Sequence, residues 1–324
     1  MCGILGHISN HPIDTTKLDL MLDAINHRGP DGRGTKSFEI NRNLNCSLGH
    51  VRLSILDLSE LGSQPMSYRD RYWITYNGEI YNFKEVREEL KEKNYDFVSG
   101  TDTEVLLAAF CEWGPNSLTK LNGMFAFSIF DSHTKEIFIA RDRFGVKPLY
   151  YFKDEDTFAF ASEIKALMAN DDIRDSVKPN IKECKNYLKK GPQVWREETL
   201  FTKIKRFPKA CFYLGSLEGL FENELNTQVY YKLPTQVVME KKDDLLIGEY
   251  RDLFSSAVKL RLRADVDIGT ALSGGLDSSS IAYFINQELK KNNSPEKQKT
   301  FSSVYWNEDY AHYDESAYID SVAK

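Results

Sequence analysis

Met1-Cys2-Gly3-Ile4-Leu5-Gly6 opens the chain, and it places a cysteine one methionine removal away from being the N-terminal residue. The α-amino group that this removal would expose has an ordinary pKa of about 8, so it is partly unprotonated at neutral pH. Because the amine lies within a few bonds of the thiol, Cys2 alone would supply both a nucleophile and a proton acceptor. A cysteine near a terminus is more often an inert thiol, so the rest of the chain has to decide between these interpretations.

Length and composition set the broad class. The 324 residues suggest about two domains, and 41% hydrophobic residues are enough to build buried cores, which excludes a disordered chain. The formal net charge of -6 argues against nucleic acid as the main partner. No run approaches the ~18 apolar residues that a membrane span needs, so we expect no membrane association.

The cysteines are odd in number and widely spaced, and no two of them form a Cys-x-x-Cys pair. They are Cys2, Cys46, Cys111, Cys184 and Cys211. This pattern favours neither a disulfide framework nor a zinc site. Reduced thiols in a cytoplasmic enzyme are the simpler interpretation.

Seven motifs follow Cys2 in register. In chain order they are HRGPDG (27–32), GHVRLSILD (49–57), NGEIYN (77–82), SGTDTE (99–104), GMFAF (123–127), RDRFGVKPLY (141–150) and SEIKAL (162–167). Together they resemble the class II glutamine amidotransferases, specifically the glutamine-hydrolysing asparagine synthetases. The likeness covers the first half almost without a gap, and it implies the four-layer α/β/β/α sandwich of N-terminal-nucleophile hydrolases for residues 2–170.

Local patterns in this half indicate short aromatic strands joined by polar turns, together with two helices. The expected strands are 72–76, 125–130, 136–140, 149–152 and 157–161, and the expected helices are 83–93 and 103–113. Short connections favour antiparallel hairpins, so we predict an α/β fold class with an α+β N-terminal half. Residues 171–245 lack a strong period and are interpreted as a connecting segment that includes a strand near 210–214.

The resemblance also implies roles for individual residues. Cys2 would attack the side-chain amide of glutamine, and the Asn77 amide with the Gly78 backbone N–H would hold the oxyanion. The family's glutamine-binding positions correspond to Arg52, Ile55, Asn77, Glu79 and Asp102. In that scheme Arg52 pairs with the glutamine carboxylate, while Glu79 and Asp102 take its ammonium group.

Each of these residues also has an ordinary structural interpretation. Arg52 suits a charge at a strand edge, and Asn77-Gly78 is a common hairpin turn pair. Asp102 suits the cap of a helix that begins at Thr103. Their joint occurrence in family order after Cys2 favours the functional interpretation. Lone histidines more often satisfy a core hydrogen bond than catalyse, so His27 and His50 receive no catalytic role.

The second half contains a glycine-rich loop between a strand and a helix. A helix over 247–261 and a strand over 266–272 precede SGGLDSS (273–279), and a second helix runs to about residue 290. Backbone amides in such a loop and the helix N-terminus face an anion, although a simple strand–helix turn capped by Ser or Asp gives the same pattern. The next strand, over 300–304, should lie parallel to 266–272.

This loop resembles the pyrophosphate loop of ATP-pyrophosphatases, which implies ATP as a substrate and Mg²⁺ near Asp277. The implied ATP-binding residues are Leu272, Ser273, Gly274, Gly275, Asp277, Ser278 and Ser303. We therefore expect residues 246–324 to begin a parallel α/β adenine-nucleotide-binding domain. Two strands and a helix over 314–323 are few for such a sheet, so we interpret this domain as incomplete.

The resemblance implies glutamine-dependent amidation of aspartate to asparagine, with the acceptor carboxylate activated as an adenylate. The chain would then be the N-terminal portion of such an enzyme, a subunit completed by a second polypeptide, or part of a homodimer. Two alternatives stay open. One is a glutaminase or ammonia-supplying module with a non-functional nucleotide half, and the other is an amidotransferase for another carboxylate such as a sugar acid.

Overall fold

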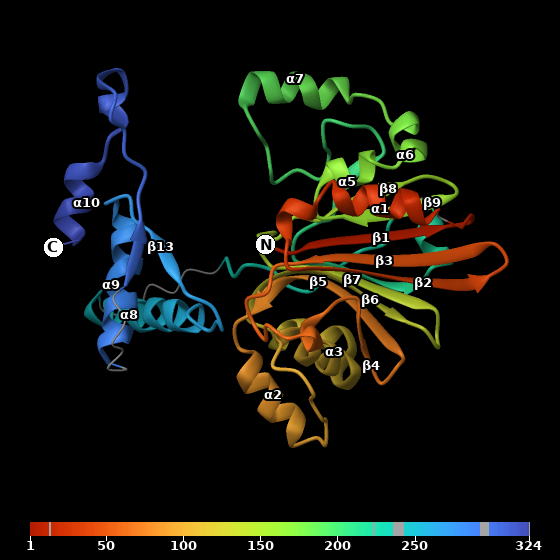
Figure 1. Cartoon of the computed structure of the whole chain (residues 1–324), viewed down its shortest axis with the longest axis horizontal. Helices are drawn as coiled ribbons and strands as arrows, with labels where there is room; N and C mark the ends of the chain where they lie inside the picture. The colour runs from red at the N-terminus through yellow and green to blue at the C-terminus, as the bar shows by residue number, and fades with distance from the viewer. Residues whose placement is uncertain (13, 223, 236–242, 292–297, 324) are drawn as a thin grey trace. The chain divides into compact units, whose positions relative to one another are not determined.

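The computed structural model describes residues 1–12, 14–222, 224–235, 243–291 and 298–323 (Figure 1). The chain divides into two compact units, Met1–Pro234 and Thr235–Lys324. Within the described residues, no helix has both the length and the apolar character needed to cross a membrane.

The first sheet of unit 1 is antiparallel, and its strand order is β10-β8-β9-β1-β3-β2. Its strands are β1 (Gly3–Ser9), β2 (Gly32–Asn41), β3 (Leu44–Arg52), β8 (Tyr150–Lys153), β9 (Thr157–Ala161) and β10 (Ile204–Arg206). The N-terminal strand β1 lies inside this sheet, where Gly3 pairs with Val51 and Leu5 pairs with Ala161. Cys2 therefore projects from the end of a central strand, beside the end of β3.

The second sheet has the order β12-β11-β7-β6-β5-β4. Its strands are β4 (Met66–Tyr68), β5 (Tyr72–Ile80), β6 (Gly123–Asp131), β7 (Glu136–Arg141), β11 (Cys211–Ser216) and β12 (Gln228–Val229). Strand β5 pairs with β6 along its whole length, but with β4 only as far as Ile74. The part of β5 that carries Asn77 and Gly78 thus has a strand neighbour on one side only among the described residues.

Helices cover the outer face of each sheet (Figure 1). The helices of unit 1 are α1 (Thr15–Asp23), α2 (Phe83–Lys91), α3 (Asp102–Trp113), α4 (Ser117–Lys120), α5 (Ile164–Met168), α6 (Asp171–Ser176) and α7 (Ile181–Lys190). Residues of α1, α5 and α6 share a core with the first sheet, and residues of α2 and α3 share another with the second. A third core, which includes Ile4, Cys46 and Phe130, lies between the sheets. The expected four-layer α/β/β/α sandwich is confirmed.

The expected strands of unit 1 are present, with longer bounds in the second sheet. The expected strand 157–161 coincides with β9, whereas 72–76 is only the first part of β5. Because Asn77 and Gly78 lie inside β5, the alternative that they form a hairpin turn is wrong. Helix α3 begins at Asp102, and the side chain of Thr101 caps it by accepting a hydrogen bond from the Glu104 N–H at 3.2 Å. Asp102 is therefore not the cap.

Residues 171–234, expected mainly as a connection, add strands to both sheets. Strand β10 pairs with β8, and β11 pairs with β7 across five residue pairs from Phe212↔Ala140 to Ser216↔Glu136. The expected strand near 210–214 corresponds to β11. Phe212 and Tyr213 point to opposite sides of β11 and enter different cores, so this segment completes unit 1 instead of merely linking two domains.

Unit 2 contains a parallel pair of strands with helices around it. Its elements are α8 (Asp243–Leu260), β13 (Gly269–Ala271), α9 (Leu276–Lys291), β14 (Lys299–Phe301) and α10 (Ser316–Ala323). The expected parallel pairing is present, with Thr270 opposite Thr300. Parallel strands are normally buried on both faces, but the three residues of β14 are exposed. Among the described residues of unit 2, the buried apolar ones are Val258, Leu272, Ala282 and Ile285.

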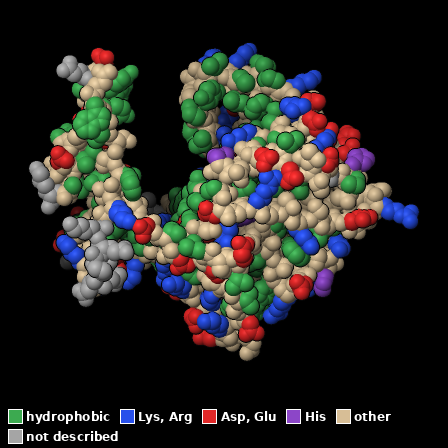
Figure 2. Space-filling model, in the orientation of Figure 1, with side chains coloured by type: hydrophobic (Ala, Val, Ile, Leu, Met, Phe, Trp, Pro, Cys, Tyr) green, Lys and Arg blue, Asp and Glu red, His purple; other side chains and the backbone are tan. Residues whose placement is uncertain are grey.

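Side chains of both charges are mixed over the face of the molecule seen in Figure 2. Apolar side chains gather over α7, where Leu188 is 83% exposed and Trp195, just beyond the helix, is 70% exposed. Of the ten residues of α7, only Glu183 is buried. Helix α7 thus packs on unit 1 much less deeply than α3, which is buried along most of its length.

We predict that Gly6→Ala destabilises unit 1 because β1 passes directly under an aromatic ring. A Cβ atom at Gly6 would lie 2.0 Å from the Phe160 ring, which is fully buried. Overpacking of this kind typically costs about 1–3 kcal/mol, and urea unfolding measures it. Gly32→Ala is the matched control, since its nearest contact would be an ordinary 3.5 Å. Equal stability of the two variants would contradict this account of β1.

Candidate active site

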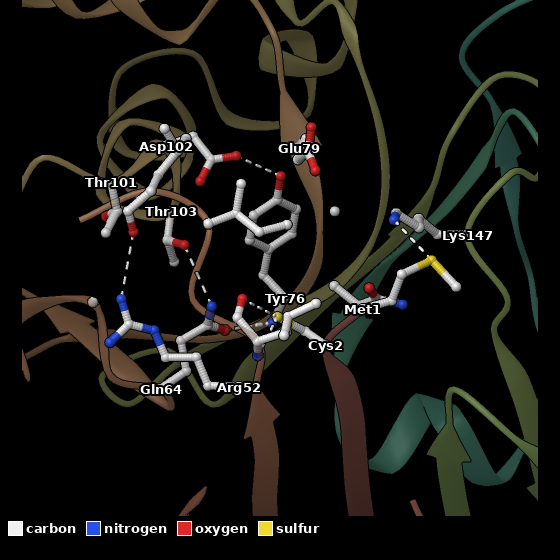
Figure 3. Close-up of a pocket in the computed structure, with 16 residues that line it drawn as sticks. Met1, Cys2, Arg52, Gln64, Tyr76, Glu79, Thr101, Asp102, Thr103 and Lys147 are labelled. Atoms are coloured by element: carbon white, nitrogen blue, oxygen red, sulfur yellow. Dashed lines mark hydrogen bonds between the residues drawn. The ribbon is translucent and has the colours of Figure 1, made fainter. Parts of the chain in front are cut away.

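One cavity in unit 1 collects all the residues predicted to bind glutamine. It has a volume of about 60 Å³ and is lined by Cys2, Arg52, Ile55, Asn77, Gly78, Glu79 and Asp102. These residues come from the position just before β1, from β3, β5 and α3, and from the loop after β3, which are far apart in the sequence (Figure 3). The fold therefore brings Cys2 and three of the seven sequence motifs to a single place.

Cys2 is held at the edge of this cavity by backbone contacts. The Leu53 N–H donates to Sγ at 3.4 Å, and Sγ lies 3.5 Å from the Leu53 carbonyl oxygen. Arg28 fixes the main chain at the same residue, because its Nε donates to the Cys2 carbonyl oxygen at 2.9 Å. Burial raises the pKa of the Cys2 thiol, and the Leu53 contact offsets part of that effect. The thiol therefore needs a nearby base in order to react at neutral pH.

The α-amine at the chain terminus lies next to this thiol. Met1 lines the same cavity as Cys2, and burial lowers the pKa of the Met1 amine below its usual value. The positive charges of Arg28 and Lys147 act in the same direction. Removal of Met1 would leave a free α-amine on Cys2 itself, and it would open the space that the Met1 side chain fills.

Arg52 ends the central strand β3, and it is only 8% exposed. Its guanidinium donates to the carbonyl oxygens of Ser59 at 2.7 Å, of Leu56 at 3.4 Å and of Asp57. A Cβ atom at Gly62 would lie 2.0 Å from Arg52 Nη2, so only glycine lets the loop approach this closely. The alternative of a strand-edge surface charge is wrong, because the loop after β3 wraps around the side chain.

Asn77 carries the most unusual polar group of the cavity. Its side chain is 1% exposed, and neither Nδ2 nor Oδ1 has a hydrogen-bond partner among the described residues. An unsatisfied buried amide costs about 1–3 kcal/mol, so it calls for a functional explanation. At Gly78 a Cβ atom would lie 2.4 Å from the Met124 carbonyl oxygen, which explains the glycine in the interior of a strand.

Two carboxylates lie on the side of the cavity away from Arg52 (Figure 3). Asp102 Oδ2 accepts a hydrogen bond from the Tyr76 hydroxyl at 2.8 Å and another from the Ile80 N–H at 2.8 Å. Burial raises the pKa of Asp102, although these hydrogen bonds offset part of the effect. Glu79 lies on the same wall. An arginine facing two acids suits a zwitterionic amino acid.

Sequence reasoning assigned no role to two further residues of this cavity, Tyr76 and Lys147. Tyr76 is buried behind Asp102, and only the fold brings it there. Lys147 lies in the motif 141–150, and a lysine flanked by Val146 and Pro148 gave no signal of burial. Its side chain nevertheless reaches the cavity and donates to the Met1 Sδ at 3.4 Å.

The two histidines set aside in the sequence have structural partners. His50 is fully buried between the sheets, where its Nε2 lies 3.1 Å from the Tyr76 carbonyl oxygen. Burial lowers the pKa of His50 to about 3, so its imidazole is neutral. His27 Nε2 lies 3.0 Å from Glu163 outside the cavity. Neither ring lines the site.

In unit 2, the glycine-rich loop joins β13 to the N-terminus of α9. Ser273 Oγ lies 3.0 Å from Ser278 Oγ, and the Ser278 hydroxyl donates to the Gly275 carbonyl oxygen at 3.2 Å. Gly274 has a φ of 77°, a left-handed conformation that favours glycine. These bonds hold the loop folded back on the first turn of α9, an arrangement suited to a phosphate group.

The remaining predicted nucleotide-site residues lie around this loop. Leu272 donates its N–H to the Phe301 carbonyl oxygen at 2.9 Å, which ties the loop to β14. Asp277 is exposed in the first turn of α9, and Ser303 is exposed just beyond β14. Among the described residues, no group of three His, Cys, Asp or Glu side chains is arranged to hold a metal ion. Asp277 alone fits Mg²⁺ only if phosphate oxygens supply the other ligands.

Comparison with known proteins gives two family matches. Residues 1–231 match the family model for a glutamine amidotransferase domain, and residues 249–324 match the model for asparagine synthase. Asparagine synthetase [glutamine-hydrolyzing] 1 of Bacillus subtilis is 37% identical over 314 residues, which are 94% of this chain and 47% of that protein. Asparagine synthetase [glutamine-hydrolyzing] 3 of the same organism is 36% identical over 90% of this chain and 46% of its own length. The chain thus spans about half the length of these relatives.

A solved structure supports the fold. The glutamine phosphoribosylpyrophosphate amidotransferase of Bacillus subtilis, complexed with ADP and GMP, matches with a TM-score of 0.52 and 17% identity. The match covers 95% of this chain and 67% of that protein. At this identity the likeness concerns the fold alone.

We predict that Asp102→Asn stabilises unit 1 at neutral pH. Folding raises the pKa of Asp102. The free energy of unfolding of the protein therefore falls as the pH rises through the unfolded-state pKa and then the folded-state pKa of this group. Asparagine avoids that loss while its oxygen still accepts both hydrogen bonds. Chemical unfolding at pH 7 should give a higher free energy for the variant, and the difference should vanish below about pH 3.

Asp131→Asn is the control of opposite sign. Burial of Asp131 raises its pKa, but the hydrogen bonds from Arg71 and from nearby backbone groups outweigh burial, so the pKa is lowered overall. Arg71 Nη2 lies 2.6 Å from Asp131 Oδ2. This variant should therefore be less stable than the wild type at pH 7. Equal losses in both variants would show that Asp102 is an ordinary structural carboxylate.

Proposed function

Because this chain belongs to the glutamine amidotransferase domain family and matches the asparagine synthase family over residues 249–324, we propose that it takes part in glutamine-dependent amidation of a carboxylate. Unit 1 would hydrolyse glutamine and release ammonia. Unit 2 would contribute the phosphate-binding loop of the ATP site, and aspartate is the proposed acceptor, as the names of the relatives suggest.

The single observation that carries this proposal is the unsatisfied Asn77 side chain beside Cys2. A buried amide with no partner among the described residues is costly, and a substrate oxyanion would give its Nδ2 group an acceptor. Donors already aimed at the position where negative charge develops provide much of the stabilisation of an acyl-transfer transition state. The Asn77 amide and the Gly78 N–H are the proposed donors.

The proposed reaction begins with removal of Met1. The Cys2 thiol then gives its proton to the free Cys2 amine, and Sγ bonds to the side-chain amide carbon of glutamine. The carbonyl oxygen becomes an oxyanion, which collapses as the carbon–nitrogen bond breaks and the amine passes its proton to the departing ammonia. Water then hydrolyses the thioester, and glutamate leaves.

The rest of the cavity would bind the amino-acid end of glutamine. Arg52 is the proposed partner of the α-carboxylate, and Glu79 and Asp102 are the proposed partners of the α-ammonium group. Ile55 also lines the cavity and would contact the aliphatic part of the side chain. Because the Arg52 guanidinium already contacts three carbonyl oxygens, it is oriented before the substrate arrives.

In unit 2, the proposed ATP site is the loop from Leu272 to Ser278, with Ser303 nearby. The N-terminus of α9 and the loop amides would face the phosphates, and Asp277 would approach the Mg²⁺ bound to them. ATP would activate the acceptor carboxylate as an adenylate with release of pyrophosphate, and ammonia from unit 1 would then displace AMP to form the amide. All the described cysteines are free, which supports the proposed cytoplasmic location.

We predict that Asn77→Ala and Cys2→Ala both abolish most glutamine hydrolysis, for different reasons. Loss of one oxyanion donor typically lowers kcat by about 10²–10³-fold, with a smaller change in KM, whereas loss of the nucleophile removes the reaction. Glutamate release from glutamine by the purified chain measures both effects.

Asn82→Ala is the matched control because it lies in the same motif but outside the cavity. The Asn82 Nδ2 group donates a hydrogen bond to the Lys120 carbonyl oxygen at 2.9 Å, and its Oδ1 accepts one from the Asn122 N–H at 2.8 Å. This variant should keep the kcat of the wild type. If Asn77→Ala were as active as Asn82→Ala, the proposed oxyanion site would be wrong.

A second measurement separates the synthetase proposal from the two alternatives. Glutamate release is followed with and without ATP, aspartate and Mg²⁺, and asparagine and AMP are assayed in the same samples. Asparagine formation would reject the glutaminase alternative, and amide formation on a sugar acid instead of aspartate would favour the other. Hydrolysis that is unaffected by ATP, with no nucleotide binding, would support a glutaminase module.

A further inference from the structure

We propose that Lys147 is an electrostatic positioning residue for Cys2, whose buried ammonium keeps the Cys2 amine in its proton-accepting form and favours ionisation of the thiol. This inference deepens the proposed function, since it rests on Cys2 being the nucleophile. Neither the family matches nor the named relatives assign a role to this lysine.

The burial of Lys147 is the first observation. The residue is only 3% exposed, and among the described residues its ammonium donates one hydrogen bond, to the Met1 thioether at 3.4 Å. A thioether is a weak acceptor, and it would leave with Met1. The ammonium would then face the cavity that holds Cys2, which Lys147 also lines.

Several hydrogen bonds hold the backbone of Lys147 in this position. The Asp142 carboxylate accepts backbone hydrogen bonds from Val146 at 2.9 Å and from Lys147 at 2.9 Å. Arg141 Nε donates to the Lys147 carbonyl oxygen at 2.8 Å. Both side chains are buried, so the loop after β7 is rigidly held from two directions. Such support is expected when a side chain must be held at a fixed place.

The other charges around Cys2 are balanced differently. Arg28 contacts the Cys2 carbonyl oxygen, but Glu163 lies 2.8 Å from its guanidinium and neutralises it. Arg52 is occupied by carbonyl oxygens of its own loop. The Lys147 charge lowers the pKa of the Cys2 thiol, and it acts together with Arg28 to lower the pKa of the terminal amine.

Acidic groups act against this cation. Asp31, Glu79 and Asp102 face the terminus, the lysine or the thiol from other elements, and Asp142 does so from the lysine's own loop. Burial lowers the pKa of Lys147, while attraction to Glu79 and Cys2 offsets part of that effect and favours the charged form. A neighbouring cation lowers the pKa of an amine and of a thiol alike, so it raises both the fraction of unprotonated amine and the fraction of thiolate at neutral pH.

The test compares Lys147→Met and Lys147→Arg in the chain from which Met1 has been removed, as verified by intact mass. Alkylation of Cys2 by iodoacetamide is followed between about pH 5 and pH 10, with the modified peptide located by mass spectrometry. The midpoint is the pH at which the rate of Cys2 alkylation is half its maximum. We expect this midpoint to be about one pH unit higher in Lys147→Met than in the wild type, so that alkylation at pH 7 is about tenfold slower. Lys147→Arg should keep the midpoint of the wild type.

Lys153→Met is the matched control, since Lys153 is also partly buried, with its pKa lowered by burial, but lines a different cavity. If Lys147→Met does not fold, Lys147→Gln removes the same charge and carries the same prediction. A folded, uncharged variant with the midpoint of the wild type would overturn the proposal. Because alkylation requires no glutamine, a wild type that fails to release glutamate would refute the proposed function and leave this result interpretable.

Discussion

The pairing of β1 with β3 and β9 is the constraint on which the rest of unit 1 depends. Gly3 opposite Val51 fixes where Cys2 leaves the sheet, and Gly6 beneath the Phe160 ring fixes the depth of the strand. Ile4 and Ile8 then fill the core between the sheets, while Leu5 fills the core beneath α1. The terminus of a chain is usually its most mobile part. Here β1 lies between β3 and β9 in the middle of a sheet, so Cys2 is held in place.

Several buried polar and charged groups around that terminus lower the stability of the fold. Asp102 is buried with a raised pKa, Lys147 is buried with a lowered pKa, and the Asn77 amide lacks partners among the described residues. Each of these groups lowers stability in the form that the proposed chemistry needs, a common compromise between stability and activity. The two sheets and their outer helices supply the apolar burial that offsets these costs.

The sequence predicted more of the fold in some elements than in others. Strand β9, with its aromatic residues, was predicted at its observed bounds, and β6, β7 and β8 were predicted to within two residues at each end. Strand β2 was not predicted because its residues are largely polar and it lies at a sheet edge, and β3 was not predicted because it buries Ser47 and His50 among its apolar residues. The residues gathered in the cavity were predicted through family order. Lys147 and Tyr76 were missed, since their burial depends on long-range packing that no local pattern records.

Covalent labelling of Cys2 would test the central claim most directly. The reagent is a glutamine analogue that carries an electrophilic diazoketone in place of the side-chain amide, applied to the purified chain with and without excess glutamine. We predict a single adduct, located on Cys2 of chains that lack Met1 and prevented by glutamine. Labelling of Cys111 or Cys184 instead, or labelling of Cys2 that glutamine does not prevent, would contradict a glutamine site built around the N-terminal cysteine.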